Sequence, residues 1–303
     1  MKREDLNKEL EENIKKEEKK EKNRKISKKI FKIIVIILLI ITLFFLYMHF
    51  IGTKGLKVKE YKVTSTKLPE SFNGLKIVHF SDIYYLSNIK EKELKNIVNK
   101  INELKPDIIV FTGDIIDTSK DIKDKDIETI TKYLKKLDAK IGKYAVKGDM
   151  DYNSYYENIT TNSDFQVINN SYELIYYKGN DPILLTGTGS CLKTDCDINQ
   201  SFSFNKIENI FTISLVHEPD TTNKIISNKP DLILSGHSLN GQIRLPFVGG
   251  IVKVENAKKY KNPKYNIGNS TLFISGGLGT NKYEFRLFNH PSINFYRLVK
   301  ETN

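Results

Sequence analysis

Five short apolar segments of this chain, each typical of a buried β-strand, are followed within three residues by an aspartate or a histidine. Amphipathic helical patterns at 91–104 and 127–137 separate the first three segments. Alternation of this kind is typical of layered α/β architecture, in which the loops beyond the carboxyl ends of the strands converge on one crevice. The residues delivered to that edge are Asp82, Asp114, Asp149, His217 and His237.

These residues are more informative as a group than singly. An aspartate after a strand is usually a turn or helix cap, and a lone histidine is usually a hydrogen-bonded polar group. Together they combine the oxygen and nitrogen ligands that suit zinc, manganese or iron. The sequence therefore predicts a metal site at this edge, whereas His79 lies within a strand and is expected in the core.

The middle of the chain predicts a second sheet. The segments 165–170, 172–177 and 182–187 are short, apolar and closely spaced, which favours antiparallel strands. A chain of 303 residues can hold one substantial domain with an appendage.

The stretch 33–51 predicts that appendage. Its nineteen residues contain no Asp, Glu, Lys or Arg, and about 20 apolar residues span the ~30 Å core of a bilayer. A cleaved signal peptide is the alternative, but no small-x-small cleavage site follows Met48. We therefore expect an uncleaved transmembrane helix in contact with membrane lipid.

Charges beside this stretch predict its orientation. Residues 1–32 carry thirteen Lys/Arg and eight Asp/Glu, which favours a solvated helix or a disordered tail. By the positive-inside rule, the lysines before the span place this tail in the cytoplasm and the domain outside the cell membrane, although lysines also follow the span. The expected parts are a charged tail at 1–32, a transmembrane helix at 33–51, a linker with a first strand at 52–72 and a folded domain at 73–299.

The net charge of +11 does not indicate a nucleic-acid partner. Nearly half of the excess lies in the tail, and the rest is spread along the chain without a dense basic patch. Because a phosphate-binding face needs clustered cations, no nucleic acid is expected.

The chain has two cysteines, Cys191 and Cys196. In an oxidising compartment they could close a small disulfide loop, and otherwise they are incidental thiols. With no other cysteine or histidine nearby they do not predict a zinc site, and both interpretations stay open.

Short motifs mark the strand ends, and they read D-I-Y (82–84), G-D-I-I-D (113–117), G-D-M-D (148–151), V-H-E-P (216–219) and G-H-S-L-N-G-Q (236–242). In order and spacing they resemble the D-x-H, G-D-x-x-D, G-N-H-D, strand-end histidine and G-H-x-H-G-G-Q of the calcineurin-like metallophosphoesterases. The segments I-S-G-G-L-G (274–279) and R-L-F-N-H-P (286–291) resemble the membrane-anchored bacterial phosphodiesterase-like branch. The resemblance covers about 73–299. It implies a four-layer α-β-β-α sandwich, two mixed sheets flanked by helices, preceded by one transmembrane helix.

The resemblance also implies two metal sites, of which the first is degenerate here. Its family ligands fall on Asp82, Tyr84, Asp114 and Leu239. Leucine offers no lone pair, and a neutral phenol with a pKa near ~10 is a poor ligand for a divalent ion. Both histidines of this site are therefore lost.

The second site keeps a full set of ligands. Its family positions are Asp114, Asp149, His217 and His237, with aspartate in place of the asparagine of G-N-H-D. We expect a single divalent ion here, zinc, manganese or iron, rather than a dinuclear centre. The histidine of G-N-H-D is Met150, and a thioether cannot donate a proton.

Two functions follow from the resemblance. The first is a membrane-anchored member of the family that is catalytically impaired or serves as a binding module. The alternative is an active one-metal phosphodiesterase or pyrophosphatase that acts on a phosphoester of the envelope or of a lipid headgroup, because loss of a general acid costs about 10²–10⁴-fold but need not abolish hydrolysis.

Overall fold

The computed structural model describes residues 3–193, 196–204 and 209–302, and the chain divides into two compact units, Met1–Met48 and His49–Asn303. The first unit consists of one helix, α1 (Arg3–Leu46), which runs through the predicted tail into the predicted span. By length and composition this helix can cross a membrane, and its apolar side chains are exposed. The charged tail is thus helical where it is described.

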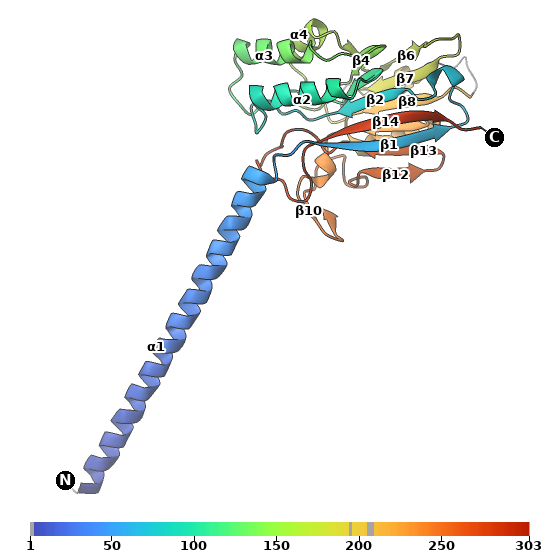
Figure 1. Cartoon of the computed structure of the whole chain (residues 1–303). Coiled ribbons are helices and arrows are strands. Elements are labelled where there is room, and N and C mark those ends of the chain that lie inside the picture. The colour runs from blue at the N-terminus through green and yellow to red at the C-terminus, as the bar shows by residue number, and fades with distance from the viewer. Residues whose placement is uncertain (1–2, 194–195, 205–208, 303) are drawn as a thin grey trace. The chain divides into compact units, whose positions relative to one another are not determined.

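The second unit contains two six-stranded sheets, in the orders β1-β14-β2-β3-β4-β5 and β12-β13-β9-β8-β7-β6 (Figure 1). Both are mixed, because parallel central strands have an antiparallel neighbour such as β14 beside β2 or β12 beside β13. The strands are β1 (Lys57–Ser65), β2 (Lys76–Phe80), β3 (Ile108–Phe111), β4 (Gly142–Ala145), β5 (Gln166–Val167), β6 (Ser171–Ile175), β7 (Ile183–Thr188), β8 (Thr212–Val216), β9 (Leu232–Ser235), β12 (Lys264–Ile267), β13 (Ser270–Ile274) and β14 (Ser292–Lys300).

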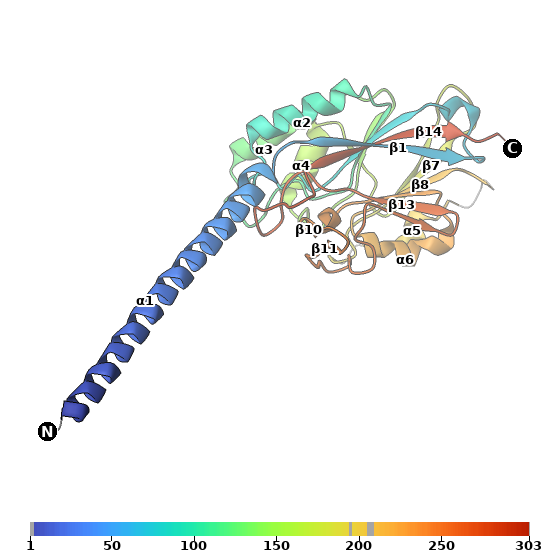
Figure 2. The ribbon, with the colours of Figure 1, turned by 60° about the horizontal axis from the view of Figure 1, so that its bottom comes forward.

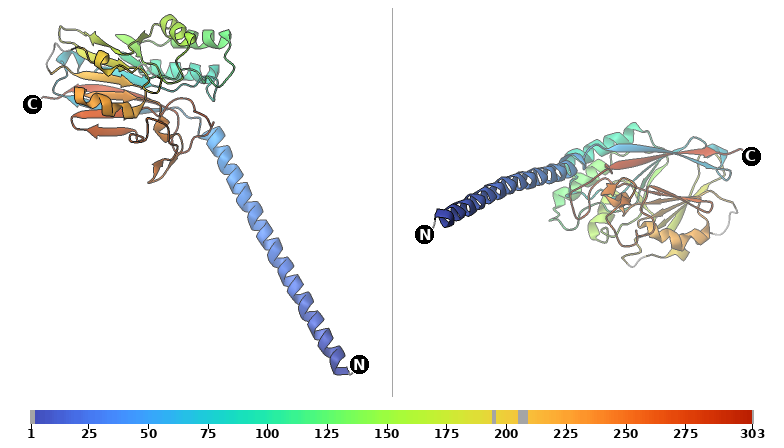
Figure 3. Two further views of the ribbon diagram at one scale, coloured as in Figure 1. Left: turned by 180° about the vertical axis from the view of Figure 1, so that it is seen from behind. Right: turned by 90° about the horizontal axis from the view of Figure 1, so that it is seen from below.

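Helices cover the outer faces of the two sheets (Figures 2 and 3). The α-helices are α2 (Glu91–Glu103), α3 (Asp124–Leu134), α4 (Ser154–Asn162), α5 (Ile198–Ser201) and α6 (Thr222–Ile225). Single 3₁₀ turns occur at Glu70–Phe72, Pro219–Thr221, Ile226–Asn228 and Leu239–Gly241, a π turn at Tyr47–Ile51, and a two-stranded ribbon at β10 (Arg244–Leu245) and β11 (Gly249–Gly250). The predicted four-layer α-β-β-α sandwich is confirmed.

Alternation along the central strands explains these layers. In β3, Ile109 and Phe111 pack among the residues of α2 and α3, whereas Ile108 and Val110 face the second sheet. Successive side chains of a strand point to opposite faces, so a strand that is apolar throughout must be covered on both sides. A third cluster packs Ile225 of α6 on the outer face of the second sheet.

Two details differ from or complete the sequence analysis. The segment at 165–170, predicted as a strand of the second sheet, instead adds β5 to the first sheet, parallel to β4. The polar turn after α4 returns the chain to the edge of the first sheet, and of the three predicted segments only β6 and β7 pair antiparallel in the second sheet. Cys191 and Cys196 form a disulfide.

Candidate metal centre

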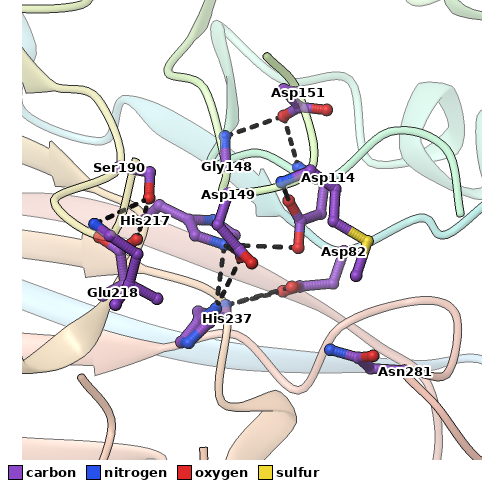
Figure 4. A network of polar contacts seen from close by, with 12 residues as sticks. Asp82, Asp114, Gly148, Asp149, Asp151, Ser190, His217, Glu218, His237 and Asn281 are labelled. Carbon is purple, nitrogen blue, oxygen red and sulfur yellow. Dashed lines mark hydrogen bonds and ion pairs between the residues drawn. The ribbon is translucent and has the colours of Figure 1, made fainter. Parts of the chain in front are cut away.

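The carboxyl ends of β2, β3 and β4 meet those of β8 and β9 at one edge of the sandwich, as the sequence predicts. Four of the predicted residues gather there, with one potential ligand atom each, all within 4.8 Å of one another (Figure 4). They are Asp114, Asp149, His217 and His237. Asp114 and His237 lie in the left-handed region, at φ 64° and 62°. Non-glycine residues seldom adopt this conformation, and it clusters at functional sites.

His217 is oriented by the strand end beside it. Its Nδ1 donates a hydrogen bond to the backbone oxygen of Thr112 at 2.6 Å, and the side chain is fully buried. The other ring nitrogen, Nε2, lies 3.1 Å from Oδ1 of Asp149 and 3.4 Å from Oδ2 of Asp114. The carbonyl therefore fixes the tautomer that turns the Nε2 lone pair toward the two carboxylates.

His237 is held in the complementary way. Its Nε2 donates to the backbone oxygen of Glu255 at 2.8 Å, while Nδ1 lies 3.1 Å from Oδ1 of Asp149. Nδ1 is also 3.2 Å from Nε2 of His217. Two imidazoles whose outer N–H groups are already used thus direct lone pairs at one point, where only a cation or a proton satisfies both. The donor set of two nitrogens and two carboxylates fits a divalent transition ion.

Electrostatics around the histidines agree with that fit. Burial alone would lower the pKa of His217, but the carboxylates of Asp114 and Asp149 outweigh it and raise this pKa well above its usual value. Burial would raise the pKa of Asp149, yet its hydrogen bonds with the two histidines hold it below the usual range. The cluster thus favours positive charge at its centre.

Asp114 has both carboxylate oxygens engaged. Its Oδ1 accepts from the backbone N–H of Met150 at 3.0 Å, and its Oδ2 accepts from the hydroxyl of Tyr84 at 2.7 Å. Asp151, the last residue of the third motif, accepts from the backbone N–H groups of Asp114 and Gly148 at 2.7 and 2.8 Å. This aspartate therefore fixes the two loops on which the candidate ligands stand.

Asp82 lies outside the group of four. Its carboxylate accepts from the backbone N–H of His237 at 3.0 Å and from the hydroxyl of Ser81. Burial raises the pKa of Asp82 to about 6. In this structure Asp82 connects the loop after β2 to the loop after β9 through the His237 N–H. That Asp82 binds a metal ion stays a prediction.

The two replaced histidine positions of the first site are filled by protein. Leu239 is buried at φ 49°, and a Cβ added at Gly277 (φ 67°) would lie 2.0 Å from Leu239 Cδ2 and 3.1 Å from Asp82 Cβ. The Tyr84 hydroxyl also accepts from Nδ2 of Asn281 at 3.2 Å. A hydrocarbon side chain and a phenol thus stand at these positions.

The motif at 286–291 does not reveal a role for Arg286, and the structure supplies one. Its guanidinium is fully buried and donates to the backbone oxygens of Gly276, Gly277 and Gly279. Burial lowers its pKa to about 10, which leaves it charged near Asp82. Arg286 stands between the apolar residues Phe285 and Leu287, and this position is the signal in the sequence that its side chain is buried.

All five histidines lie among the described residues, and none of the other three joins the site. His79 is buried in the core, as predicted, and contacts the hydroxyls of Tyr296 and Thr112. His290 contacts the backbone oxygen of Lys54, and His49 that of Glu284. The first site is therefore not refilled by a histidine from elsewhere.

Comparison with known proteins supports the motif interpretation. The model of the calcineurin-like phosphoesterase family matches residues 75–267. An uncharacterized metallophosphoesterase, YkuE of Bacillus subtilis, is 32% identical over 85% of this chain and 90% of its own length. The UDP-2,3-diacylglucosamine pyrophosphatase LpxG of Chlamydia muridarum is 25% identical over 78% of this chain and 88% of its own. A transmembrane protein with a metallophosphoesterase domain from Danio rerio is 26% identical over 68% of this chain, which spans about half of that relative. This chain belongs to the calcineurin-like phosphoesterase family.

Proposed function

We propose that this protein is a membrane-anchored, metal-dependent phosphoesterase that works with one divalent ion. The observation that carries the proposal is the convergence of Asp114, Asp149, His217 and His237 within 4.8 Å, with both imidazoles turned inward by backbone carbonyls. An ion held there would supply a Lewis acid and lower the pKa of a bound water toward ~7. With one ion in place, we expect the replaced residues to lower the rate of hydrolysis rather than to abolish it.

The residues around the centre define which chemistry the chain itself can support. Asp149 brings a second carboxylate where the family pattern has a neutral asparagine, which favours retention of a single dication. Tyr84 holds Oδ2 of Asp114 through its hydroxyl. Met150 cannot protonate a leaving group, so the substrates expected to turn over are those whose leaving group departs as a stable anion.

The class of substrate is proposed from the anchor and the relatives. LpxG, by its name, is a pyrophosphatase of UDP-2,3-diacylglucosamine, a lipid-bearing nucleotide. A pyrophosphate of a lipid headgroup has a good leaving group, because a phosphate departs as a stable anion, and it lies next to a membrane-anchored domain. We therefore propose such a headgroup as the substrate.

The proposed location is the cell membrane, with the tail in the cytoplasm and the domain outside. The support is the excess of lysine before the apolar helix and the Cys191–Cys196 disulfide, which forms in oxidising compartments.

A second candidate is a module that binds a phosphoester and a metal without turnover. It is favoured by Met150 at the family's catalytic histidine and by Leu239 at a ligand position. The two candidates share the metal and differ only in hydrolysis.

One experiment separates them. The full chain is purified in detergent, its metal content is measured, and hydrolysis of bis-p-nitrophenyl phosphate is followed with added manganese or zinc. About one ion per chain, with turnover lost in Asp114→Asn and kept in the matched control His290→Ala, would support the enzyme. One ion with no turnover would support the binding module, and absence of metal under all loading conditions would reject both.

A further inference from the structure

The tip of the β10–β11 hairpin carries the most exposed apolar side chains of the folded domain as described. Phe247 is completely exposed and Val248 is 66% exposed, with Leu245 and Ile251 exposed at either side. Hairpin tips in water usually consist of Gly, Asn, Asp or Ser, which hydrogen-bond and tolerate positive φ. Here Phe247 has a φ of 65°, and its ring is exposed to solvent. An exposed aromatic side chain at this position is unusual unless the tip has an apolar partner.

The base of the hairpin is tightly fixed, so the exposure does not come from a slack loop. Arg244 donates through Nη1 to the backbone oxygen of Asn240 at 2.6 Å and through Nη2 to Oδ1 of Asn262 at 3.1 Å. A Cβ added at Gly241 would lie 2.4 Å from Cα of Gly250, so the two backbones touch. The tip is thus held away from the sheets (Figure 1).

Two other segments extend the apolar surface. The loop at 281–290 exposes Tyr283 (54%) and Phe288 (64%), and it joins the hairpin through the Arg244 N–H, which donates to the backbone oxygen of Leu287 at 2.9 Å. The same loop contacts the end of the apolar stretch, because His49 Nδ1 lies 2.8 Å from the backbone oxygen of Glu284. We call the exposed side chains of 49–51, 283, 288 and the hairpin tip 245–251 the apolar rim.

We propose that the apolar rim inserts into the interfacial layer of the bilayer that the N-terminal helix crosses, with Phe247 and Val248 among the acyl chains. Continuity of the rim with the apolar stretch favours a bilayer over a protein partner. His49, Phe50 and Ile51 are the last residues of the apolar stretch and belong to the same compact unit as the hairpin. The contacts of the 281–290 loop therefore place the rim beside residues 49–51, which directly follow the first unit in the chain. Aromatic and aliphatic side chains flanked by cations such as Arg244 and Lys282 are the composition that binds this layer.

The rim is connected to the candidate metal centre through the chain. The hairpin begins directly after the 236–242 motif that carries His237, and its returning arm supplies the Glu255 carbonyl that orients the same histidine at 2.8 Å. Seating the hairpin in lipid would therefore steady both sides of His237. If the proposed hydrolysis holds, a headgroup at the interface is presented close to the centre.

The test measures insertion without relying on metal or turnover. The full chain, with Cys191→Ser and Cys196→Ser, receives Phe247→Cys, is labelled with the fluorophore NBD and is placed in nanodiscs of phosphatidylethanolamine and phosphatidylglycerol. The matched control is Tyr176→Cys, an aromatic residue that is 55% exposed and directly follows β6. Figure 1 shows β6 in a part of the domain away from β10.

We expect blue-shifted emission at position 247, quenching by doxyl-labelled acyl chains, and iodide quenching reduced roughly threefold or more relative to position 176. Val248→Cys serves as a second variant with the same expectation. Equal iodide access at 247, 248 and 176, with no doxyl quenching, would overturn the proposal and show that the rim faces water beside this bilayer. That failure would say nothing against the metal centre, because neither metal nor substrate enters the measurement.

Discussion

The hydroxyl of Tyr84 donates a 2.7 Å hydrogen bond to Oδ2 of Asp114. In the family pattern that oxygen belongs to the aspartate shared by two metals, and the residue at position 84 is a histidine ligand of the first. Burial and the neighbouring carboxylates raise the pKa of Tyr84 well above its usual value, so the phenol stays protonated and remains a donor. A neutral hydrogen-bond donor thus stands where the resemblance would place a metal–ligand interaction.

Restoring both lost histidines should restore the first metal. The double variant Tyr84→His with Leu239→His is expected to raise the metal content from about one to about two ions per chain, because two imidazoles would then stand beside Asp82 and Asp114. Metal content of the purified, manganese-loaded protein gives the answer. Tyr84→Phe with Leu239→Met is the matched control and should stay at one, and a restored pair that also stays at one would show that the site is closed for other reasons.

Met150→His should restore a proton donor at the leaving group. For a substrate with a poor leaving group, such as an alkyl phosphodiester, turnover is expected to rise about 10²-fold or more, whereas the p-nitrophenyl ester should change little. The slope of rate against leaving-group pKa should therefore flatten. Met150→Gln, which adds polarity without a proton to donate as an acid, serves as the control, and an equal gain in both variants would argue against proton transfer.

Asp149→Asn should weaken retention of the ion. The substitution keeps an oxygen ligand but removes one negative charge from a buried cluster, and we expect the dissociation constant of manganese to rise roughly tenfold, which is about 1.4 kcal/mol. Calorimetric titration of the metal-free protein measures it. An unchanged constant would contradict the prediction and mean that the negative charge of Asp149 does not help to retain the ion.

The sequence predicts the fold and the four gathered residues because both depend on local patterns. A short apolar run predicts a buried strand. The Asp114 or His217 that follows such a run predicts the edge of the sheet at which the ligands gather. The roles of Asp82 and Arg286 could not be predicted, since they depend on backbone groups that approach only after folding: the His237 N–H on Asp82 and the glycine carbonyls on Arg286. The exposed hairpin tip was equally hidden, because its apolar run resembles a core strand until its burial is known.

His79 should make the domain sensitive to acid. Burial lowers the pKa of His79 to about 3 in the folded protein, against about 6.5 in the unfolded chain. Below pH 6.5 the unfolded state therefore binds more protons, and the free energy of unfolding should decrease as the pH falls toward 3, by up to about 4 kcal/mol. Above pH 6.5 both states are neutral at this position and no change is expected from it.

The variant His79→Gln tests this directly in the full chain. Glutamine can replace the contacts with the Thr112 and Tyr296 hydroxyls but cannot be protonated in this range. Chemical unfolding followed at pH 7.5 and pH 5 should show a smaller pH-dependent loss of stability in His79→Gln than in the parent, with His290→Gln, at a half-buried histidine, as the comparison. An identical loss in all three proteins would assign the acid sensitivity to other groups. The comparison is made between pH values rather than between absolute stabilities, because the substitution itself alters packing in the core.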